Sequence, residues 1–288
     1  RRPNLRRRDG LVRHGASIED HALESRQLRR VTLPDFLAIL SGSAVGLVLA
    51  LIGGGGSILA TPALLYVVGV ANPHMAIGTS ALAVSVNAFA NLINHARRGN
   101  VKWRCAIVFA VAGVVGAAVG AAVGKMTDAQ VLLPLFALLM IVVGVAMLRP
   151  RKDDGNGDVV LNAQNAPKLV AFGLGAGALS GFFGIGGGFL IVPGLVAATG
   201  MTMIQAVGSS LFSVGSFGAT TAASYALDGL VDWRIAALFI GGGLIGGLIG
   251  ASFATHLSKQ RGALQRVFAG VVFLVAAYML YRSLIAPS

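Results

Sequence analysis

The sequence predicts an all-α, multi-pass membrane protein built from two homologous repeats with glycine-broken helices. Its 288 residues are 55% hydrophobic and only 12% charged, with a mean hydropathy of +0.77, a composition typical of membrane proteins rather than soluble domains. Long apolar segments follow one another along the chain, and two glycine runs interrupt them at matching places. These observations place most of the chain in a bilayer and divide it into two halves.

The chain begins with a polar, basic tail, residues 1–32. Nine arginines lie within residues 1–30 without an apolar run, so the tail lacks the pattern of a secretory signal peptide. We expect it to be disordered or to lie on the membrane surface, where residues 18–28 can form a short amphipathic helix. The net charge of +12 lies in the tail and loops. It predicts contacts with anionic lipid headgroups rather than with nucleic acid.

Two sets of apolar segments follow, separated by a polar linker. A helix needs roughly 20 apolar residues to cross the hydrocarbon core, so the short segments beside each glycine run are expected to be broken or half-spanning helices. The first repeat, residues 33–148, has segments at about 36–52, 57–71, 75–94, 105–124 and 131–148. The linker covers residues 149–168, and the second repeat, residues 169–288, has segments at about 169–184, 189–200, 203–226, 235–254 and 265–285.

The two halves match beyond their glycine runs. The runs are offset by 131 residues, and later elements match at an offset of 130, which indicates a duplicated unit. Paired breaks at equivalent points of two membrane repeats are a pointer to a transporter's substrate site. The matching pairs are Gly53–Gly56 with Gly184–Gly188, Gly78–Ser80 with Gly208–Ser210, and Gly99–Arg104 with Gly229–Arg234.

Charges beside equivalent loops favour inverted repeats. Residues 97–104 carry four cations, whereas residues 228–234 carry two acids and one arginine. By the positive-inside rule these loops lie on opposite faces of the membrane, and the linker is cytoplasmic. Ten segments in this order put the basic tail outside, in conflict with its charge. A parallel arrangement of four plus four segments, which keeps the tail inside, stays open.

The glycine runs are candidates for a substrate site. Neither ends in the Gly-Lys-Ser/Thr of a phosphate-binding loop, so nucleotide binding is unsupported. Each glycine in the run weakens a helix by about 1 kcal/mol. Close helix packing, the alternative explanation, accounts poorly for several glycines in succession. Freed N–H groups and the positive end of the next helix, expected near Ser57 or Phe189, attract an anion. The candidate residues are Gly54, Gly55, Gly56, Ser57, Gly186, Gly187 and Gly188.

Prolines and hydroxyl side chains beyond the runs complete the candidate site. Pro62 and Pro193 can kink a half-helix and free a carbonyl, although a proline without a ligand role explains them equally well. Asn87 and Asn91 share a helix face, and we expect them to act as contacts between helices. Four hydroxyls can donate to an oxyanion, unless they bond back to their own helix. They are Thr79, Ser80, Ser209 and Ser210.

Missing residue types exclude several function classes. Apart from Asp35, at the start of the first segment, no acidic residue lies within the apolar segments. This argues against a carboxylate proton relay or a carboxylate-rich cation site. The single cysteine, Cys105, excludes an internal disulfide, and no catalytic set or His-rich cluster is present. We therefore expect no enzyme activity, no catalytic residue, no metal and no cofactor.

Three features carry a family resemblance: the paired glycine motifs followed by a proline, the Gly78-Thr79-Ser80 element and the Gly-x-Val-x-Trp-Arg loops. Over about residues 33–285 they resemble the TauE/SafE family of sulfite exporters. The first motif departs from the more usual pattern by an extra glycine. The resemblance implies a secondary transporter of sulfur-containing anions, such as sulfite or organosulfonates, in the bacterial inner membrane. We expect alternating access around a midplane site between the two runs. A non-transporting membrane scaffold or accessory subunit is the alternative.

Overall fold

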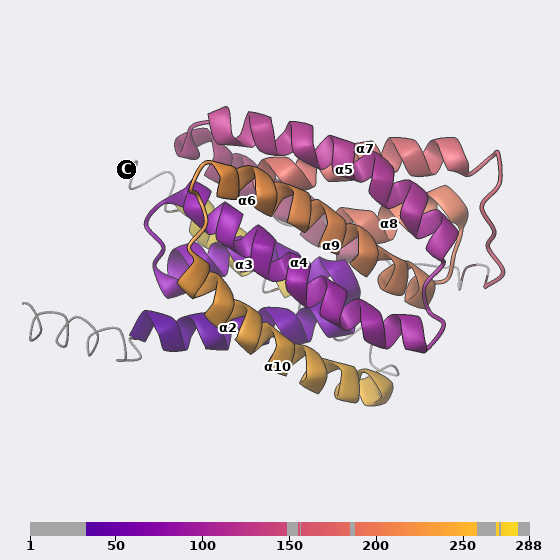
Figure 1. Ribbon diagram of the computed structural model, residues 1–288, viewed down its shortest axis with the longest axis horizontal. Coiled ribbons are helices and arrows are strands. Elements are labelled where there is room, and N and C mark those ends of the chain that lie inside the picture. Colours follow the sequence, from indigo (N-terminus) through magenta and orange to yellow (C-terminus); the bar gives the residue numbers. More distant parts are fainter. Residues whose placement is uncertain are drawn as a thin grey trace, which may run out of the picture.

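The computed structural model describes residues 33–148, 155, 157–184, 188–257, 269–270 and 272–281, and every element assigned in these ranges is helical (Figure 1). The basic tail, with its expected amphipathic helix, lies outside the described residues. The first half contains α2 (Leu33–Ile52), η1 (Gly53–Leu59), α3 (Ala60–Pro62), η2 (Ala63–Val68), α4 (Pro73–Arg97), α5 (Trp103–Met126) and α6 (Ala129–Leu148). The second half contains α7 (Ala166–Phe183), α8 (Gly188–Thr199), α9 (Met203–Leu227) and α10 (Trp233–Leu257).

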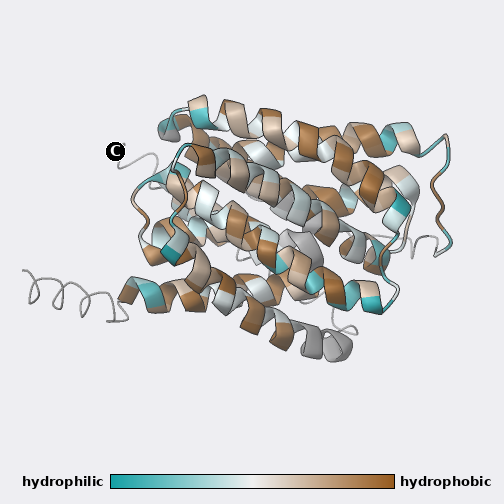
Figure 2. Cartoon of the chain, in the orientation of Figure 1, coloured by the Kyte–Doolittle hydropathy of each residue, from teal (hydrophilic) through white to brown (hydrophobic). Residues whose placement is uncertain are grey.

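Among the described residues, five helices are long and apolar enough to cross a membrane. Hydrophilic residues gather at the two ends of the bundle, and hydrophobic residues cover its middle (Figure 2). The chain is therefore a multi-pass membrane protein, as the sequence predicts. The five candidate spans are Leu33–Leu51, Pro73–Arg97, Trp103–Met126, Ala166–Phe183 and Trp233–Gly250. Shorter apolar helices lie at Gly56–Val68, Gln130–Val142, Leu190–Thr199 and Val272–Tyr281.

The outward face of α5 is apolar, and its inward face is made of small residues. Four valines recur every fourth position on the outer face and are 51 to 63% exposed. An exposed apolar stripe of this length is costly in water but suits contact with lipid tails. The outer residues are Val111, Val115, Val119 and Val123, and the buried inner ones include Gly113, Gly116, Ala117, Gly120 and Gly124.

Glycines bring two helix pairs into close contact. A Cβ atom added to Gly46 on α2 would lie 2.0 Å from the carbonyl oxygen of Gly243 on α10. A Cβ atom added to Gly177 on α7 would lie 2.0 Å from the carbonyl oxygen of Gly113 on α5. Gly46 and Gly177 occupy matching positions in the two halves, as do Gly243 and Gly113. We refer to Gly99–Arg104 and Gly229–Arg234 as the Trp loops. The first helix of each half therefore packs against the helix that follows the Trp loop of the other half.

Both of these pairs are parallel, whereas α4 and α9 are antiparallel. Along α2 and α10 the contacts advance together, from Gly42 at Phe239 to Gly46 at Gly243. In α4 and α9 they run in opposite order, because Gly78 meets Tyr225 and Phe89 meets Gly215. Figure 1 shows the opposite directions of α4 and α9 along the long axis of the bundle. The parallel contacts of α7 with α5 run from Gly173 at Phe109 to Gly177 at Gly113.

The polar linker ends earlier than the sequence predicts. Helix α7 begins at Ala166, so residues 166–168, expected in the linker, are helical. Pro167 lies in the first turn, where its fixed φ favours helix formation and its missing N–H costs nothing. Just before the helix, the Oδ1 atoms of Asn162 and Asn165 accept backbone N–H bonds that close the turn. Residues 149–154 of the linker lie outside the described residues.

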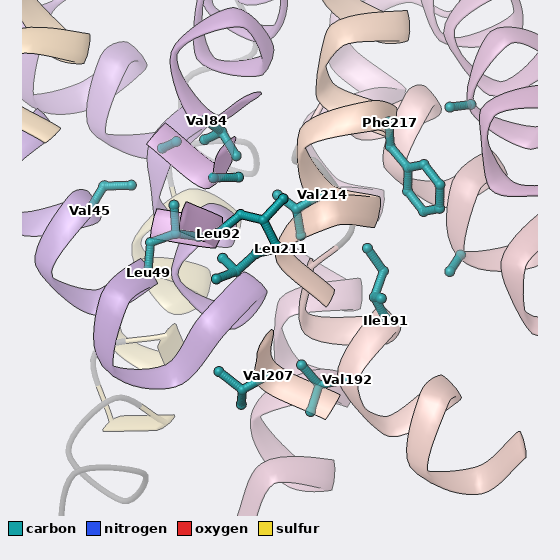
Figure 3. Close-up of a cluster of buried hydrophobic side chains, with 14 of the residues drawn as sticks. Val45, Leu49, Val84, Leu92, Ile191, Val192, Val207, Leu211, Val214 and Phe217 are labelled. Atoms are coloured by element: carbon teal, nitrogen blue, oxygen red, sulfur yellow. The ribbon is translucent and has the colours of Figure 1, made fainter. Parts of the chain in front are cut away.

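A buried apolar cluster fills the space between the two halves (Figure 3). It draws side chains from helices that are far apart in the sequence, so it holds the halves together through their middle. Residues from α2, α4, α8 and α9 contribute to it. They include Leu49, Val84, Leu92, Ile191, Val192, Leu211 and Val214.

Candidate functional site

The first glycine run forms a tight helical turn instead of the unwound backbone expected from the sequence. Gly53–Leu59 is a 3₁₀-helix, and the α-helical conformation resumes at Ala60 rather than near Ser57. Side chains three residues apart eclipse one another in a 3₁₀-helix, and glycine avoids that crowding. The run also folds back on α2, since a Cβ atom at Gly56 would lie 2.6 Å from the backbone nitrogen of Leu49.

Pro62 marks a second irregularity in this half. It is buried at the end of α3, and the next residues, Ala63–Val68, form a π-helix. Proline has no N–H to continue the α-helical ladder, which is consistent with the wider turn. The π-helix ends at Gly69, with φ of 86°, and the N–H of Val70 donates to the carbonyl oxygen of Leu64 at 2.9 Å. Such π-helical turns are rare and occur frequently at functional sites.

Only the two ends of the second glycine run are described. Helix α7 ends at Phe183, and the residue that caps it, Gly184, has a φ of 65° in the left-handed region that glycine adopts without strain. Residues 185–187 lie outside the described residues, so the candidates Gly186 and Gly187 are not placed. Helix α8 begins at Gly188, one residue before the expected start at Phe189, and carries Pro193 half-buried within it.

Segments next to the two breaks lie close together. The 3₁₀-helix η1, which contains the first run, contacts α8, the helix that follows the second run. Ser80 on α4 connects the segment after the first run with the start of the second, because its Oγ lies 2.8 Å from Oγ1 of Thr61 and donates to the carbonyl oxygen of Gly184 at 3.3 Å. Thr61 and Ser80 are 1% and 0% exposed. We refer to Thr61, Ser80 and Gly184 as the Ser80 cluster.

The Ser80 hydroxyl also donates to the carbonyl oxygen of Ile77, at 2.9 Å. Its single proton is therefore shared between two carbonyls, and the Thr61 hydroxyl serves as the donor to Ser80. Thr61 was not selected from the sequence, because the matching residue of the second half is Val192. A hydroxyl within an otherwise apolar stretch after the glycine run was the signal that could have identified it.

Thr79 and Ser209, which match in the repeat, accept hydrogen bonds from the opposite half. The backbone N–H of Asp232 donates to Oγ1 of Thr79, and that of Lys102 donates to Oγ of Ser209, both at 2.9 Å. These N–H groups lie where α10 and α5 begin and lack a partner within the helix. Ser210 donates back to the carbonyl oxygen of Val207, at 2.8 Å. The first two hydroxyls therefore cap helices, and Ser210 bonds to its own helix.

Replacing Thr79 with valine is expected to destabilise the fold by about 0.5–2 kcal/mol, the usual cost of losing a helix cap. Ser209→Ala should cost a similar amount, because its hydroxyl caps the matching helix. Thermal unfolding of the purified protein in detergent measures both effects. Thr220→Val is the control, since the Thr220 hydroxyl bonds only to Ser216 within α9. If the Thr79 and Ser209 variants unfold at the same temperature as the Thr220→Val control, the capping role is contradicted.

Asn87 lies between helices, as expected, but its side chain forms no hydrogen bond there. Its side chain is 0% exposed, and neither amide atom has a hydrogen-bond partner. Asn91 donates to the carbonyl oxygen of Asn87 within α4. Both amides lie against α10, because a Cβ atom at Gly243 would be 2.1 Å from Nδ2 of Asn87 and one at Gly247 would be 3.0 Å from Nδ2 of Asn91.

Neither a metal site nor a reactive thiol site emerges from the described part of the chain. No group of three or more His, Cys, Asp or Glu side chains there could hold a metal ion. Cys105 is free, 1% exposed and part of the apolar core. The polar chemistry near the two breaks is thus supplied by hydroxyls and backbone groups, which suit hydrogen bonding to a ligand.

The family model described as sulfite exporter TauE/SafE matches residues 38–279, a range that contains both breaks and every candidate residue. The chain belongs to the TauE/SafE family. The resemblance carried by the glycine motifs and Trp loops is thereby confirmed. Family membership and the apolar helices agree that this is a multi-pass membrane protein.

Curated relatives match most of the chain. A "Probable membrane transporter protein" of Xylella fastidiosa (strain Temecula1) is 54% identical over 250 residues, 86% of this chain and 95% of the relative. The "Probable membrane transporter protein YunE" of Bacillus subtilis (strain 168) is 24% identical over 269 residues, 86% of this chain and 98% of the relative. No solved structure matches the chain. The family and the names of these relatives agree on a membrane transporter.

Proposed function

We propose that this protein is a secondary transporter that exports small sulfur-containing anions, such as sulfite or organosulfonates, across the bacterial inner membrane. The observation that carries the proposal is the Ser80 cluster, which connects the segment after the first glycine run with the start of the second run inside the helical bundle. The family description supports sulfite as the substrate class. Apart from Asp35, the described apolar segments contain no acid, so no carboxylate repels an anion near the breaks.

Hydroxyl and backbone N–H groups are the proposed ligands of the anion. Such neutral donors stabilise an oxyanion without a buried cation, and a helix N-terminus adds a favourable partial charge. Without a fixed opposite charge the anion is also released more readily. The proposed contacts are Thr61 and the sequence candidates Gly54, Gly55, Gly56, Ser57, Pro62, Thr79, Ser80, Gly186, Gly187, Gly188, Pro193, Ser209 and Ser210. The Thr61, Ser80 and Ser210 hydroxyls would turn from their present acceptors to donate to the anion, whereas Pro62 and Pro193 have no N–H and would only shape the backbone.

The proposal includes an inverted relation between the halves, with alternating access around the breaks. Support comes from the helix directions. Helices α2 and α10 are parallel, α7 and α5 are parallel, and α4 and α9 are antiparallel. Because a short Trp loop reverses the chain after α4 and after α9, each helix then runs opposite to its counterpart in the other half. Rocking of the halves against each other would expose the breaks to one side at a time.

Transport is tested by the flux of radiolabelled sulfite in proteoliposomes that contain the full chain. An inside-negative potential should drive efflux, since it favours exit of an anion by about 2.3 kcal/mol per charge per 100 mV. Thiosulfate and an organosulfonate tested in parallel would define the substrate range. Absence of flux for every small anion, with the protein shown to be folded, would refute transport and favour the scaffold alternative.

A further inference from the structure

Two ion pairs join the halves at one end of the bundle. The ammonium Nζ of Lys125, at the end of α5, lies 2.5 Å from Oδ2 of Asp228, just after α9. The guanidinium Nη2 of Arg234, at the start of α10, lies 2.7 Å from Oδ2 of Asp35 on α2. The first pair connects residues 103 positions apart and the second residues 199 apart. Each pair therefore links the first half to the second.

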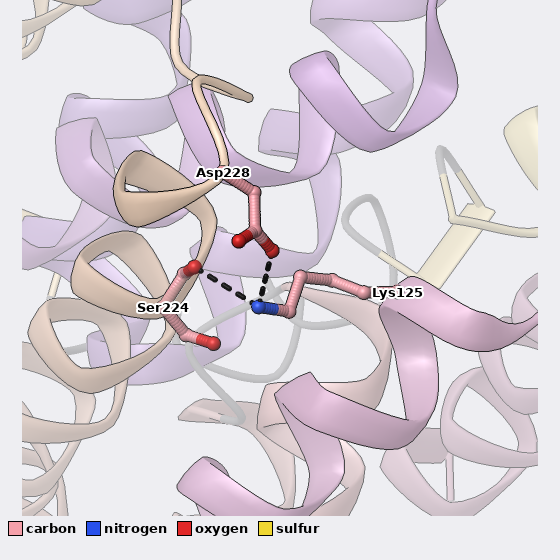
Figure 4. A network of polar contacts seen from close by, with 3 residues as sticks. All are labelled: Lys125, Ser224 and Asp228. Carbon is pink, nitrogen blue, oxygen red and sulfur yellow. Dashed lines mark hydrogen bonds and ion pairs between the residues drawn. The ribbon is translucent and has the colours of Figure 1, made fainter.

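Lys125 is held by more than its carboxylate partner. Nζ also donates to the carbonyl oxygen of Ser224 at 3.1 Å, as Figure 4 shows. The same atom lies over the ring of Tyr225, 5.9 Å from its centroid. The Tyr225 side chain is 0% exposed, and its buried hydroxyl has no hydrogen-bond partner. A partly buried cation thus lies beside the ring of a tyrosine whose hydroxyl is an unused donor, where α5 meets α9.

The matching loop at the opposite end of the bundle is basic instead of acidic. The residue that matches Asp228 in the first half is Arg98. Four cations crowd this loop, and within the described part of the chain none of them forms an ion pair. An anion that approaches there meets unpaired positive charge, whereas at the Lys125 end the cation is already occupied by a carboxylate. The four cations are Arg97, Arg98, Lys102 and Arg104.

We propose that Lys125 is an anion-binding residue at the end of the bundle where α5 meets α9, and that the oxyanion displaces the Asp228 carboxylate from the lysine ammonium there. The assignment rests on the proposed transport function. Sulfite and carboxylate oxygens accept the same charge-assisted hydrogen bonds, so Lys125 stays paired throughout the exchange. Return of Asp228 then expels the anion and restores the contact between α5 and α9. The 50% exposure of the Asp228 side chain gives the carboxylate room to move aside.

The concentration dependence of sulfite flux, measured from each side of oriented proteoliposomes, tests this assignment. Charge-assisted hydrogen bonds contribute enough that Lys125→Met should raise KM about tenfold or more for sulfite supplied at the Lys125 side. Asp228→Asn removes the competing carboxylate and should lower that KM by at least about threefold. Neither variant should change the KM measured from the opposite side. Lys125→Arg, which keeps the charge, should remain close to the wild type.

Asp35→Asn is the matched control. It breaks the second ion pair at the same end without altering Lys125, so it should leave KM unchanged from both sides. Unchanged KM values in Lys125→Met and Asp228→Asn, with equal losses of thermal stability, would overturn the assignment and leave a purely structural ion pair. If Lys125→Met fails to fold, the decrease in KM for Asp228→Asn still decides the question. A wild-type protein without flux would instead refute the proposed transport function.

Discussion

Replacing Ser80 with alanine is expected to lower sulfite flux by at least about tenfold, which corresponds to the ~1.4 kcal/mol of a hydrogen bond lost from a buried site. The Ser80 hydroxyl contacts Thr61 after the first glycine run and Gly184 at the start of the second. Its removal leaves the Thr61 hydroxyl without its partner and separates the two breaks. Since alanine retains a high helix propensity, α4 itself should persist and the protein should still insert.

Initial rates of sulfite efflux from proteoliposomes, normalised to the amount of folded protein, measure this effect. Thr61→Val should reduce flux in the same direction, because it removes the other hydroxyl of the pair and keeps a similar shape. Thr220→Ala provides the control, since its hydroxyl bonds to the Ser216 carbonyl on α9, away from the Ser80 cluster. Flux in Ser80→Ala equal to that of the control would remove the cluster from the transport site.

Matching glycines of the two halves have the same local backbone conformation. Gly69 and Gly200, which match at an offset of 131, have φ values of 86° and 71°. Gly99 and Gly229, which match at 130, both have φ of 70°. These turns need glycine in each half, so the same chemical requirement appears twice in the sequence. For the described helices α2 and α4 to α10, the apolar segments were predicted to within a few residues, because hydropathy and length decide them locally.

Features that depend on the meeting of distant segments were not predicted. The 3₁₀ turn of the first run arises where Gly56 folds against α2, and Thr61 gains its importance only from contact with Ser80. The capping role of Thr79 requires the N–H of Asp232, 153 residues away. The repeat pattern does not point to Thr61 or Lys125 either, because Val192 and Thr255 stand at the matching positions of the second half.

Valine at Gly46 and valine at Gly177 should both prevent stable assembly of the bundle. In each case the new Cβ atom would lie 2.0 Å from a backbone carbonyl oxygen of the neighbouring helix. A backbone atom cannot move aside as the end of a side chain can. Each substitution should therefore lower the free energy of unfolding by at least about 1–3 kcal/mol, the loss typical of overpacking. The yield of monodisperse protein in detergent and its unfolding temperature measure the effect.

Gly175→Val separates contact from helix propensity in this experiment. Gly175 lies on α7 two residues before Gly177, and no atom approaches within 4 Å of a Cβ built there. The substitution therefore changes the same helix without touching a neighbour and should be tolerated. Equal losses at Gly46 and Gly177 would indicate that the pairing of α2 with α10 and that of α7 with α5 are energetically equivalent, as a duplicated unit requires. If valine is tolerated at Gly46 but not at Gly177, the two halves have diverged in how their helices pack. That result would weaken the case for rocking around a symmetric pair of breaks.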